Sequence, residues 1–125
     1  LAITCAATSS KVLILGSVSG DGYAAYWIYV RIARDGTSIG HADAASNRPT
    51  VHSGSGGTNV GYSVITSAVN FLDSPSSTSE LTYTFQTRNA YGDGVVYINR
   101  AGRHADNTVN DAVYTSTMTL LEIGA

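Results

Sequence analysis

The sequence predicts a single all-β domain, an antiparallel β-sandwich of jelly-roll type. Apolar and polar residues alternate with a period of two along most of the chain, and no stretch has the 3.6-residue period of a helix. Short apolar segments are separated by Gly-rich turn signals at close spacing, which is typical of sandwiches. The chain has 125 residues, a length that suits one domain and is too short for two. Hydrophobic residues make up 43% of it, which is enough to form one buried core.

The clearest predicted strand spans residues 26–34. Its alternation gives two faces, one with Tyr26, Ile28, Val30 and Ile32 and the other with Trp27, Tyr29 and Arg31. The dipeptide Asp35-Gly36 follows at once, and this pair tolerates the positive φ angles of a tight hairpin turn. Residues 37–40 are therefore predicted to return as the second strand of a hairpin.

A second hairpin is predicted from residues 81–88 and 95–99. Leu81, Tyr83 and Phe85 share one face of the first segment, and residues 91–94 carry a Gly-Asp-Gly turn signal. Further strands are predicted at 11–19, 62–72 and 115–123. The other turn signals fall at 20–22, 53–57, 74–79 and 102–111, and two of these segments are long enough to be functional loops.

Two of the predicted strands are apolar on both faces. The run Val12-Leu13-Ile14-Leu15 has no polar face, and neither does Leu120-Leu121. A half-exposed strand has one polar face, so each of these strands is expected either to lie between two layers or to present its second face to another subunit.

Composition and charge limit the partners. Charged residues are only 13% of the chain, about half the usual share. The net charge is −2, and the Lys and Arg residues are scattered along the sequence, which argues against nucleic acid. No run approaches the roughly 20 apolar residues of a membrane span. Cys5 is the only cysteine, so no intrachain disulfide forms and a small buried side chain is expected there.

No catalytic signature is present, and we expect the chain not to be an enzyme. In Gly16-Ser17-Val18-Ser19-Gly20 the centre of a nucleophile elbow would be Val18 rather than Ser. Glycoside hydrolysis needs two opposed carboxylates, yet the only two glutamates lie near predicted strand ends. Five of the seven aspartates fit turns: Asp21, Asp35, Asp73, Asp93 and Asp111. No cofactor is expected.

Histidine and aromatic residues leave alternatives open. His41-Ala42-Asp43, His52 and His104-Ala105-Asp106 would suit a metal or a general base, but the spacing is nonspecific and a surface or capping role is the commoner case. Trp27 and Tyr29 either fill a second packing layer, face a ligand or meet a neighbouring subunit. Tyr23, Tyr91 and Tyr114 either face a ligand or pack along the base of a loop.

Several segments in order along the chain resemble the C-terminal head, or knob, domain of bacteriophage tail-fibre and related virion fibre proteins. They are Ser9-Ser10-Lys11-Val12-Leu13-Ile14-Leu15, Arg31-Ile32-Ala33-Arg34-Asp35-Gly36-Thr37, Asn47-Arg48, Asn70-Phe71-Leu72-Asp73-Ser74-Pro75, Tyr83-Thr84-Phe85-Gln86, Val96-Tyr97-Ile98-Asn99-Arg100 and Ser116-Thr117-Met118-Thr119-Leu120-Leu121-Glu122-Ile123. The resemblance runs from about Ile3 to the end. The segments 70–75 and 119–123 are its more specific parts.

This resemblance implies a homotrimeric β-sandwich at the distal end of a virion tail fibre, extracellular on release, that serves adsorption to the host. It carries no shared catalytic or metal-binding motif. The chain begins at Leu1 rather than Met, and we expect it to be the C-terminal piece of a longer fibre protein. The implied partners are further copies of the chain and a host surface glycan or protein, with no nucleic acid and no membrane insertion.

Three functions compete: a receptor-binding head, a structural domain that trimerises and caps the fibre without touching a receptor, and a polysaccharide-degrading tailspike domain, which the scarcity of glutamate disfavours. Contact regions are expected at 20–26, 41–57, 89–93 and 102–114. The candidate ligand-binding residues are Tyr23, His41, Asp43, Arg48, His52, Tyr91, Asp93, Arg103 and His104. The candidate residues of the oligomer interface are Leu13, Leu15, Trp27, Tyr29, Leu121 and Ile123.

Overall fold

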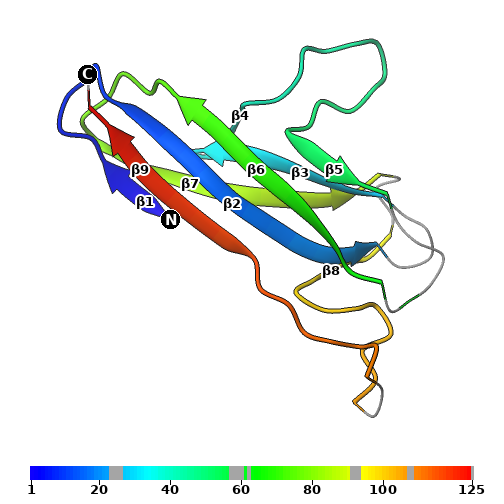
Figure 1. Cartoon of the computed structure of the whole chain (residues 1–125). Helices are drawn as coiled ribbons and strands as arrows, with labels where there is room; N and C mark the ends of the chain where they lie inside the picture. The colour runs from blue at the N-terminus through cyan, green and yellow to red at the C-terminus, as the bar shows by residue number, and fades with distance from the viewer. Residues whose placement is uncertain (23–26, 57–60, 62, 91–93, 107–108, 125) are drawn as a thin grey trace.

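Two antiparallel sheets make up the computed structural model, which describes residues 1–22, 27–56, 61, 63–90, 94–106 and 109–124 (Figure 1). Over these residues there is no helix, and the architecture is consistent with the predicted β-sandwich. The strands are β1 (Ala2–Thr4), β2 (Lys11–Gly22), β3 (Ile28–Arg34), β4 (Thr37–Ile39), β5 (Ser53–Ser55), β6 (Ile65–Asp73), β7 (Glu80–Asn89), β8 (Val96–Ile98) and β9 (Thr117–Ile123).

The first sheet has the order β1-β7-β3-β4, and β5 pairs with the other end of β3. The second sheet is built on the long strand β2, with β6 along one edge. Two strands share the opposite edge of β2: β9 pairs with residues 11–17, and β8 pairs with residues 20–22. The chain crosses between the sheets several times, so most strand pairs join segments that are distant in sequence.

The core lies between the two sheets and follows from the alternation. Ile28, Val30 and Ile32 of β3 are buried on the inner face, as predicted, and Leu81 and Tyr83 of β7 are buried beside them. From the second sheet, Val12, Ile14, Val18 and Val69 complete the cluster, together with Cys5. Cys5 is 2% exposed, which confirms the expectation of a small buried side chain. Burial, together with the charges of Glu122 and Asp73, raises the pKa of its thiol.

The first predicted hairpin is confirmed. Asp35 and Gly36 have φ angles of 48° and 82°, the positive values that the turn requires. The turn is also fastened to β7, because the Thr82 amide donates to Asp35 Oδ1 over 2.8 Å and the Asp35 amide donates to the Thr82 carbonyl over 2.9 Å. The strand begins at Ile28, since Trp27 lies outside it and Tyr26 is outside the described residues.

The second predicted hairpin is wrong. β8 does not return along β7 but pairs with Gly20, Asp21 and Gly22 of β2 in the other sheet. The reason is that β9 pairs with β2 only as far as Ser17. The end of β2 beyond Ser17 would otherwise have unpaired backbone groups on this edge. β8 forms hydrogen bonds with those groups. No local sequence pattern predicts which backbone groups of β2 are left for it.

Two predicted turns are strands instead. Residues 20–22 continue β2, and residues 53–55 form β5 against β3. Asp21 and Asp73 are accordingly buried strand residues rather than turn residues. The first strand, β1, was not expected because its three residues are too short for a pattern. It pairs with β7, and Ile3 packs against the core.

The outward face of the second sheet carries an apolar cluster, here called the outer apolar face. It consists of Leu13, Leu15, Leu72, Leu121 and Ile123. Leu13 lies directly opposite Leu72 on one side and Leu121 on the other, so three leucines form one row across the sheet. Leu72 and Leu121 are each 46% exposed and Ile123 is 42% exposed. In the described part of the chain, no third layer covers these side chains.

Candidate functional site

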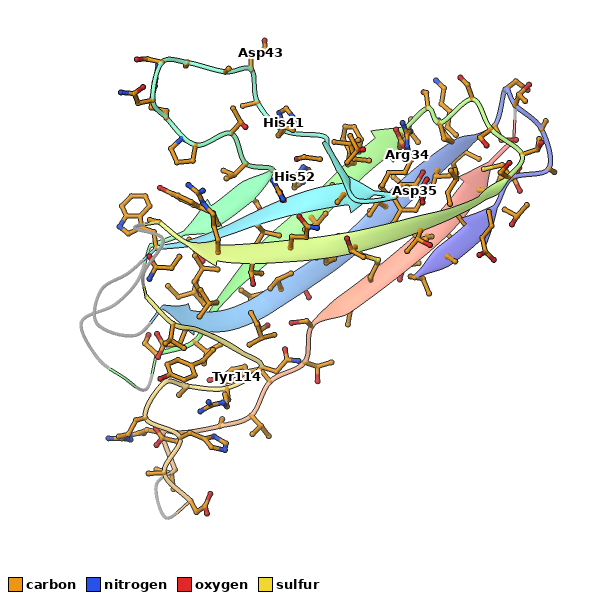
Figure 2. The ribbon with its side chains drawn as sticks, turned by 180° about the vertical axis from the view of Figure 1, so that it is seen from behind. Arg34, Asp35, His41, Asp43, His52 and Tyr114 are labelled. Carbon is orange, nitrogen blue, oxygen red and sulfur yellow. The ribbon has the colours of Figure 1, made fainter. Side chains whose placement is uncertain are left out.

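A groove of about 730 Å³ lies on the outward face of the first sheet, beneath the segment 40–52 (Figure 2). It is called the arginine groove below. It is lined by Tyr29, Val30, Arg31, Ala44, Arg48, Pro49, Thr50, Val51, Gln86, Thr87 and Arg88. Its volume is within the range of small-molecule sites. The described lining contains three arginines and no acidic residue.

The floor of the groove follows from strand alternation and register. Because Ile28, Val30 and Ile32 point inward, Tyr29 and Arg31 point outward. On β7 the same rule turns Gln86 and Arg88 outward, and the register places Arg31 opposite Gln86 and Tyr29 opposite Arg88. Arg31 Nε donates to Gln86 Oε1 over 2.6 Å, and the Arg88 guanidinium lies 5.9 Å from the centre of the Tyr29 ring.

The wall of the groove is a short turn that presents Arg48. The Arg48 amide donates to the Ala45 carbonyl over 3.2 Å, and Arg48 Nε donates to the same carbonyl over 3.3 Å. Ser46 has a φ of 56°, the left-handed conformation that closes this turn. The Ala45 carbonyl therefore holds the guanidinium near the wall through Nε, which leaves the two terminal nitrogens for other partners.

His52 fastens the base of the segment 40–52. Its Nδ1 lies 2.7 Å from the Gly40 carbonyl, and the Asn70 amide donates to Nε2 over 3.4 Å. Because the Asn70 amide donates to Nε2, Nδ1 is the ring nitrogen that can donate to the Gly40 carbonyl. The ring packs edge-on against Phe71 at a centroid distance of 6.2 Å. His52 was predicted as a ligand-binding residue. In the structure its contacts with Gly40, Asn70 and Phe71 give it a structural role at the base of the segment 40–52.

The other candidate ligand residues do not gather in one place. His41 and Asp43 are exposed on the segment 40–52, away from the groove lining (Figure 2). Arg103 binds Asp111 through two nitrogens, with a shortest distance of 2.7 Å. It lies with the exposed His104 in the segment 99–115, on the opposite side of the sandwich from the segment 40–52 (Figure 1). Tyr23, Tyr91 and Asp93 lie outside the described residues.

The candidate interface residues divide between the two sheets. Leu13, Leu15, Leu121 and Ile123 share the outer apolar face. Tyr29 lies in the floor of the arginine groove, on the other sheet. Trp27 is 54% exposed just before β3, so it does not fill a second packing layer. Tyr114, the remaining aromatic candidate, is exposed and lies on the segment 99–115 (Figure 2).

Sequence reasoning missed the convergence of the three arginines. Arg31, Arg48 and Arg88 are far apart in the sequence, so no basic cluster was expected. In the folded structure all three line one groove. Alternation alone already turned Arg31 and Arg88 outward. Only the pairing of β3 with β7 brings them together, and that pairing joins segments that lie far apart in the sequence.

The described residues contain no group of three or more His, Cys, Asp or Glu side chains that could hold a metal ion. In the same residues no helix is both long and apolar enough to cross a bilayer. Buried ionisable groups occur elsewhere. Burial and then the carboxylate of Asp73 raise the pKa of Tyr83 far above its usual value, which fits a phenol that serves as a hydrogen-bond donor in the core.

The buried carboxyl of Asp21 makes stability depend on pH. Only 1% of the residue is exposed, and burial raises its pKa although the Gly102 amide donates to Oδ2 over 2.9 Å. Because the folded state holds this proton more tightly than the unfolded state, the contribution is full below the unfolded pKa of about 3.9 and is lost as the pH rises through the folded value. We expect Asp21→Asn to gain stability relative to the wild type between pH 4 and pH 7, measured by urea unfolding.

The exposed Asp43→Asn provides the matched control for Asp21→Asn, since it removes the same charge from a solvated position. It is expected to follow the wild type at each pH. A constant difference between Asp21→Asn and the wild type from pH 4 to pH 7 would contradict the assignment.

Comparisons with known proteins give no assignment. No protein-family model matches the sequence, and no match was found among curated proteins or among solved structures.

Proposed function

We propose that this chain is the receptor-binding head of a phage tail fibre, which assembles as a homotrimer at the distal end of the virion fibre and adsorbs to a glycan or protein on the host surface. It acts by binding rather than by catalysis. The proposal rests on the resemblance of its segments to fibre head domains, and the arginine groove is the structural observation that carries it. The repeated crossing of the chain between the two sheets supports the finer assignment to the jelly-roll type.

The arginine groove supports a binding role because it has the features that are common to small-molecule binding sites. It is concave, it has an aromatic side chain in its floor, and it has a few polar groups fixed by the scaffold. Tyr29, Arg31, Gln86 and Arg88 belong to two paired strands, so their positions do not depend on a loop. Three such grooves on one trimer would multiply a weak single-site affinity.

The outer apolar face supports self-association. Exposed apolar side chains that are contiguous on one sheet face mark interaction surfaces in soluble proteins. Among the described residues, Leu72, Leu121 and Ile123 are each more than two-fifths exposed around the half-buried Leu13. The arginine groove is on the other sheet, so association through this face leaves the groove open.

The oligomeric state tests this assembly. We expect the wild type to elute with three times the chain mass of 13.0 kDa in size-exclusion chromatography with light scattering. The double substitution Leu13→Lys and Leu121→Lys is expected to give a monomer, because two charges in one row of the face must lose their water on association. The control Val109→Lys changes a side chain that is 98% exposed and is expected to stay trimeric. A monomeric wild type at micromolar concentration would contradict the proposal.

A purely structural role is the second candidate, and the outer apolar face favours it as well. A domain that only trimerises and caps the fibre needs this face and has no use for the groove. A glycan array separates the two functions: binding to bacterial surface glycans supports the receptor-binding head. A trimer that binds no array glycan and no intact host cell supports the structural domain.

A further inference from the structure

The three arginines of the groove differ from Arg34 and Arg103, which form ion pairs with aspartates. Arg34 binds Asp73 at 2.7 Å and Arg103 binds Asp111 at 2.7 Å, while Arg100 lies 4.4 Å from the centre of the Tyr97 ring. Within the described residues, Arg31, Arg48 and Arg88 have no carboxylate within 4.0 Å. Among the residues that the structure describes, no acidic side chain lines the groove.

Positive charges are thus gathered at a place where no described carboxylate neutralises them. Arg31 and Arg88 are diagonal neighbours on adjacent antiparallel strands, where the separation is about 7–8 Å. Like charges at this distance repel one another, and an anion between them relieves the repulsion while accepting charge-assisted hydrogen bonds. Arg48 contributes a third guanidinium from the wall.

Gln86 lies in the position that a neutralising residue would occupy. It is directly opposite Arg31 and accepts from Arg31 Nε over 2.6 Å through its amide oxygen. A glutamate would make the same hydrogen bond and also supply a negative charge. The amide orients Arg31 without neutralising it, so the guanidinium remains available to an outside anion.

The remaining lining suits a saccharide that carries an acidic group. Thr50 provides a hydroxyl, Gln86 provides an amide, and the Tyr29 ring and Pro49 provide apolar surface. Sugar rings present both hydroxyls and apolar faces, and a site for them pairs polar groups with an aromatic side chain. A nucleic acid fits less well, because three cations in one groove cannot follow a strand of phosphates and the chain has a net charge of −2.

We propose that the arginine groove binds the acidic group of a saccharide, a carboxylate or a phosphate, between Arg31, Arg48 and Arg88. This inference rests on the proposed receptor-binding function and names the chemical class of the receptor. Arg31 and Arg88 hold the anion from the sheet, Arg48 holds it from the wall, and Gln86 keeps Arg31 in place.

The test is the affinity of the 125-residue protein for four probes, measured by biolayer interferometry at 20 mM and 200 mM NaCl. The probes are an oligogalacturonate, which carries carboxylates, a phosphorylated mannan oligosaccharide, neutral maltohexaose, and a single-stranded oligonucleotide of matched charge. We expect one of the two acidic saccharides to bind more tightly than the other probes and to weaken at high salt. The preferred acid identifies carboxylate or phosphate as the receptor group.

Two variants assign the binding to the groove. Gln86→Glu neutralises Arg31 without changing the shape of the side chain, and Arg88→Gln removes one guanidinium. Each is expected to weaken acidic-saccharide binding about tenfold or more, which is the effect of losing a charge-assisted hydrogen bond. Thr78→Glu adds the same charge as Gln86→Glu at an exposed position outside the groove, and Lys11→Gln removes a charge from the other sheet. Both controls are expected to bind within twofold of the wild type.

The outcomes separate the two proposals. Acidic-saccharide binding that is unchanged in Gln86→Glu and Arg88→Gln, or binding of neutral glycans only, overturns the groove inference and leaves the receptor-binding function standing. Tighter binding of the oligonucleotide than of either acidic saccharide also overturns it. A protein that binds no glycan and no host cell overturns the receptor-binding function itself. Melting temperatures of all variants, measured in parallel, identify a loss that comes from unfolding.

Discussion

Asp73→Ala is expected to destabilise the domain by about 3–5 kcal/mol, because it removes one member of a buried charged network. Asp73 Oδ2 accepts from Arg34 Nη1 over 2.7 Å and from the Tyr83 hydroxyl over 2.7 Å. Tyr83 is fully buried, and the side chains of Asp73 and Arg34 are only 9% and 28% exposed. Without the carboxylate, a buried hydroxyl and a largely buried guanidinium both lose their acceptor.

The same network joins the two sheets. Arg34 and Tyr83 belong to β3 and β7 of the first sheet, and Asp73 ends β6 of the second. Its loss therefore weakens the contact between the layers as well as the hydrogen bonds. Urea unfolding followed by circular dichroism measures the effect, provided that the wild type unfolds in one transition.

Tyr83→Phe is the control for Asp73→Ala. It removes only the hydroxyl and keeps the ion pair between Arg34 and Asp73, so we expect a loss of about 1 kcal/mol. If Asp73→Ala cost no more than Tyr83→Phe, the charged pair would contribute nothing to stability and the assignment would be wrong.

The second large effect is expected from Gly16→Val. Gly16 points into the core from the middle of β2, and a Cβ there would collide with the backbone carbonyl of Thr117 on β9 and would lie 2.8 Å from the ring of Phe85 on the opposite sheet. The ring can shift, but the carbonyl belongs to the strand pairing and cannot move without breaking it. We expect a loss of about 3 kcal/mol or more, the upper part of the range for overpacked cores.

Gly56→Ala is the matched control for Gly16→Val, since a Cβ at Gly56 meets nothing within 4 Å. It is expected to change the free energy of unfolding by less than about 0.5 kcal/mol. Thermal unfolding of the two variants against the wild type measures both effects. Equal stability of Gly16→Val and Gly56→Ala would mean that β9 does not lie against β2 at this point.

Gly16→Val is also expected to affect assembly, whereas Asp73→Ala is not. β9 carries Leu121 and Ile123 of the outer apolar face, so a displaced β9 also disrupts the proposed trimer contact. Asp73→Ala changes a residue on the inner side of the sheet and leaves that face intact. We therefore expect Gly16→Val to reduce the oligomer mass at concentrations where the domain is still folded.

The strands were predictable where the signal is local. The alternation in 28–34 and 81–88 fixes which side chains point inward, because a strand has a strict period of two and one face must be buried. The Asp35-Gly36 turn was predictable for a similar reason, since its backbone conformation is a property of two adjacent residues. The same alternation predicts that Arg31 and Arg88 point outward, whichever strand lies beside them.

Pairing across the sheets was not predictable in this way. β8 was expected beside β7 and lies beside β2, because its position depends on which backbone groups β9 leaves unpaired. The arginine groove depends on the same kind of information: Arg31 and Arg88 meet only through the β3–β7 register, and Arg48 joins them only through the folded segment 40–52. Side-chain direction is a local property of each strand. Proximity is set by the competition of all strands for the same edges, and that competition is decided only when the whole chain has folded.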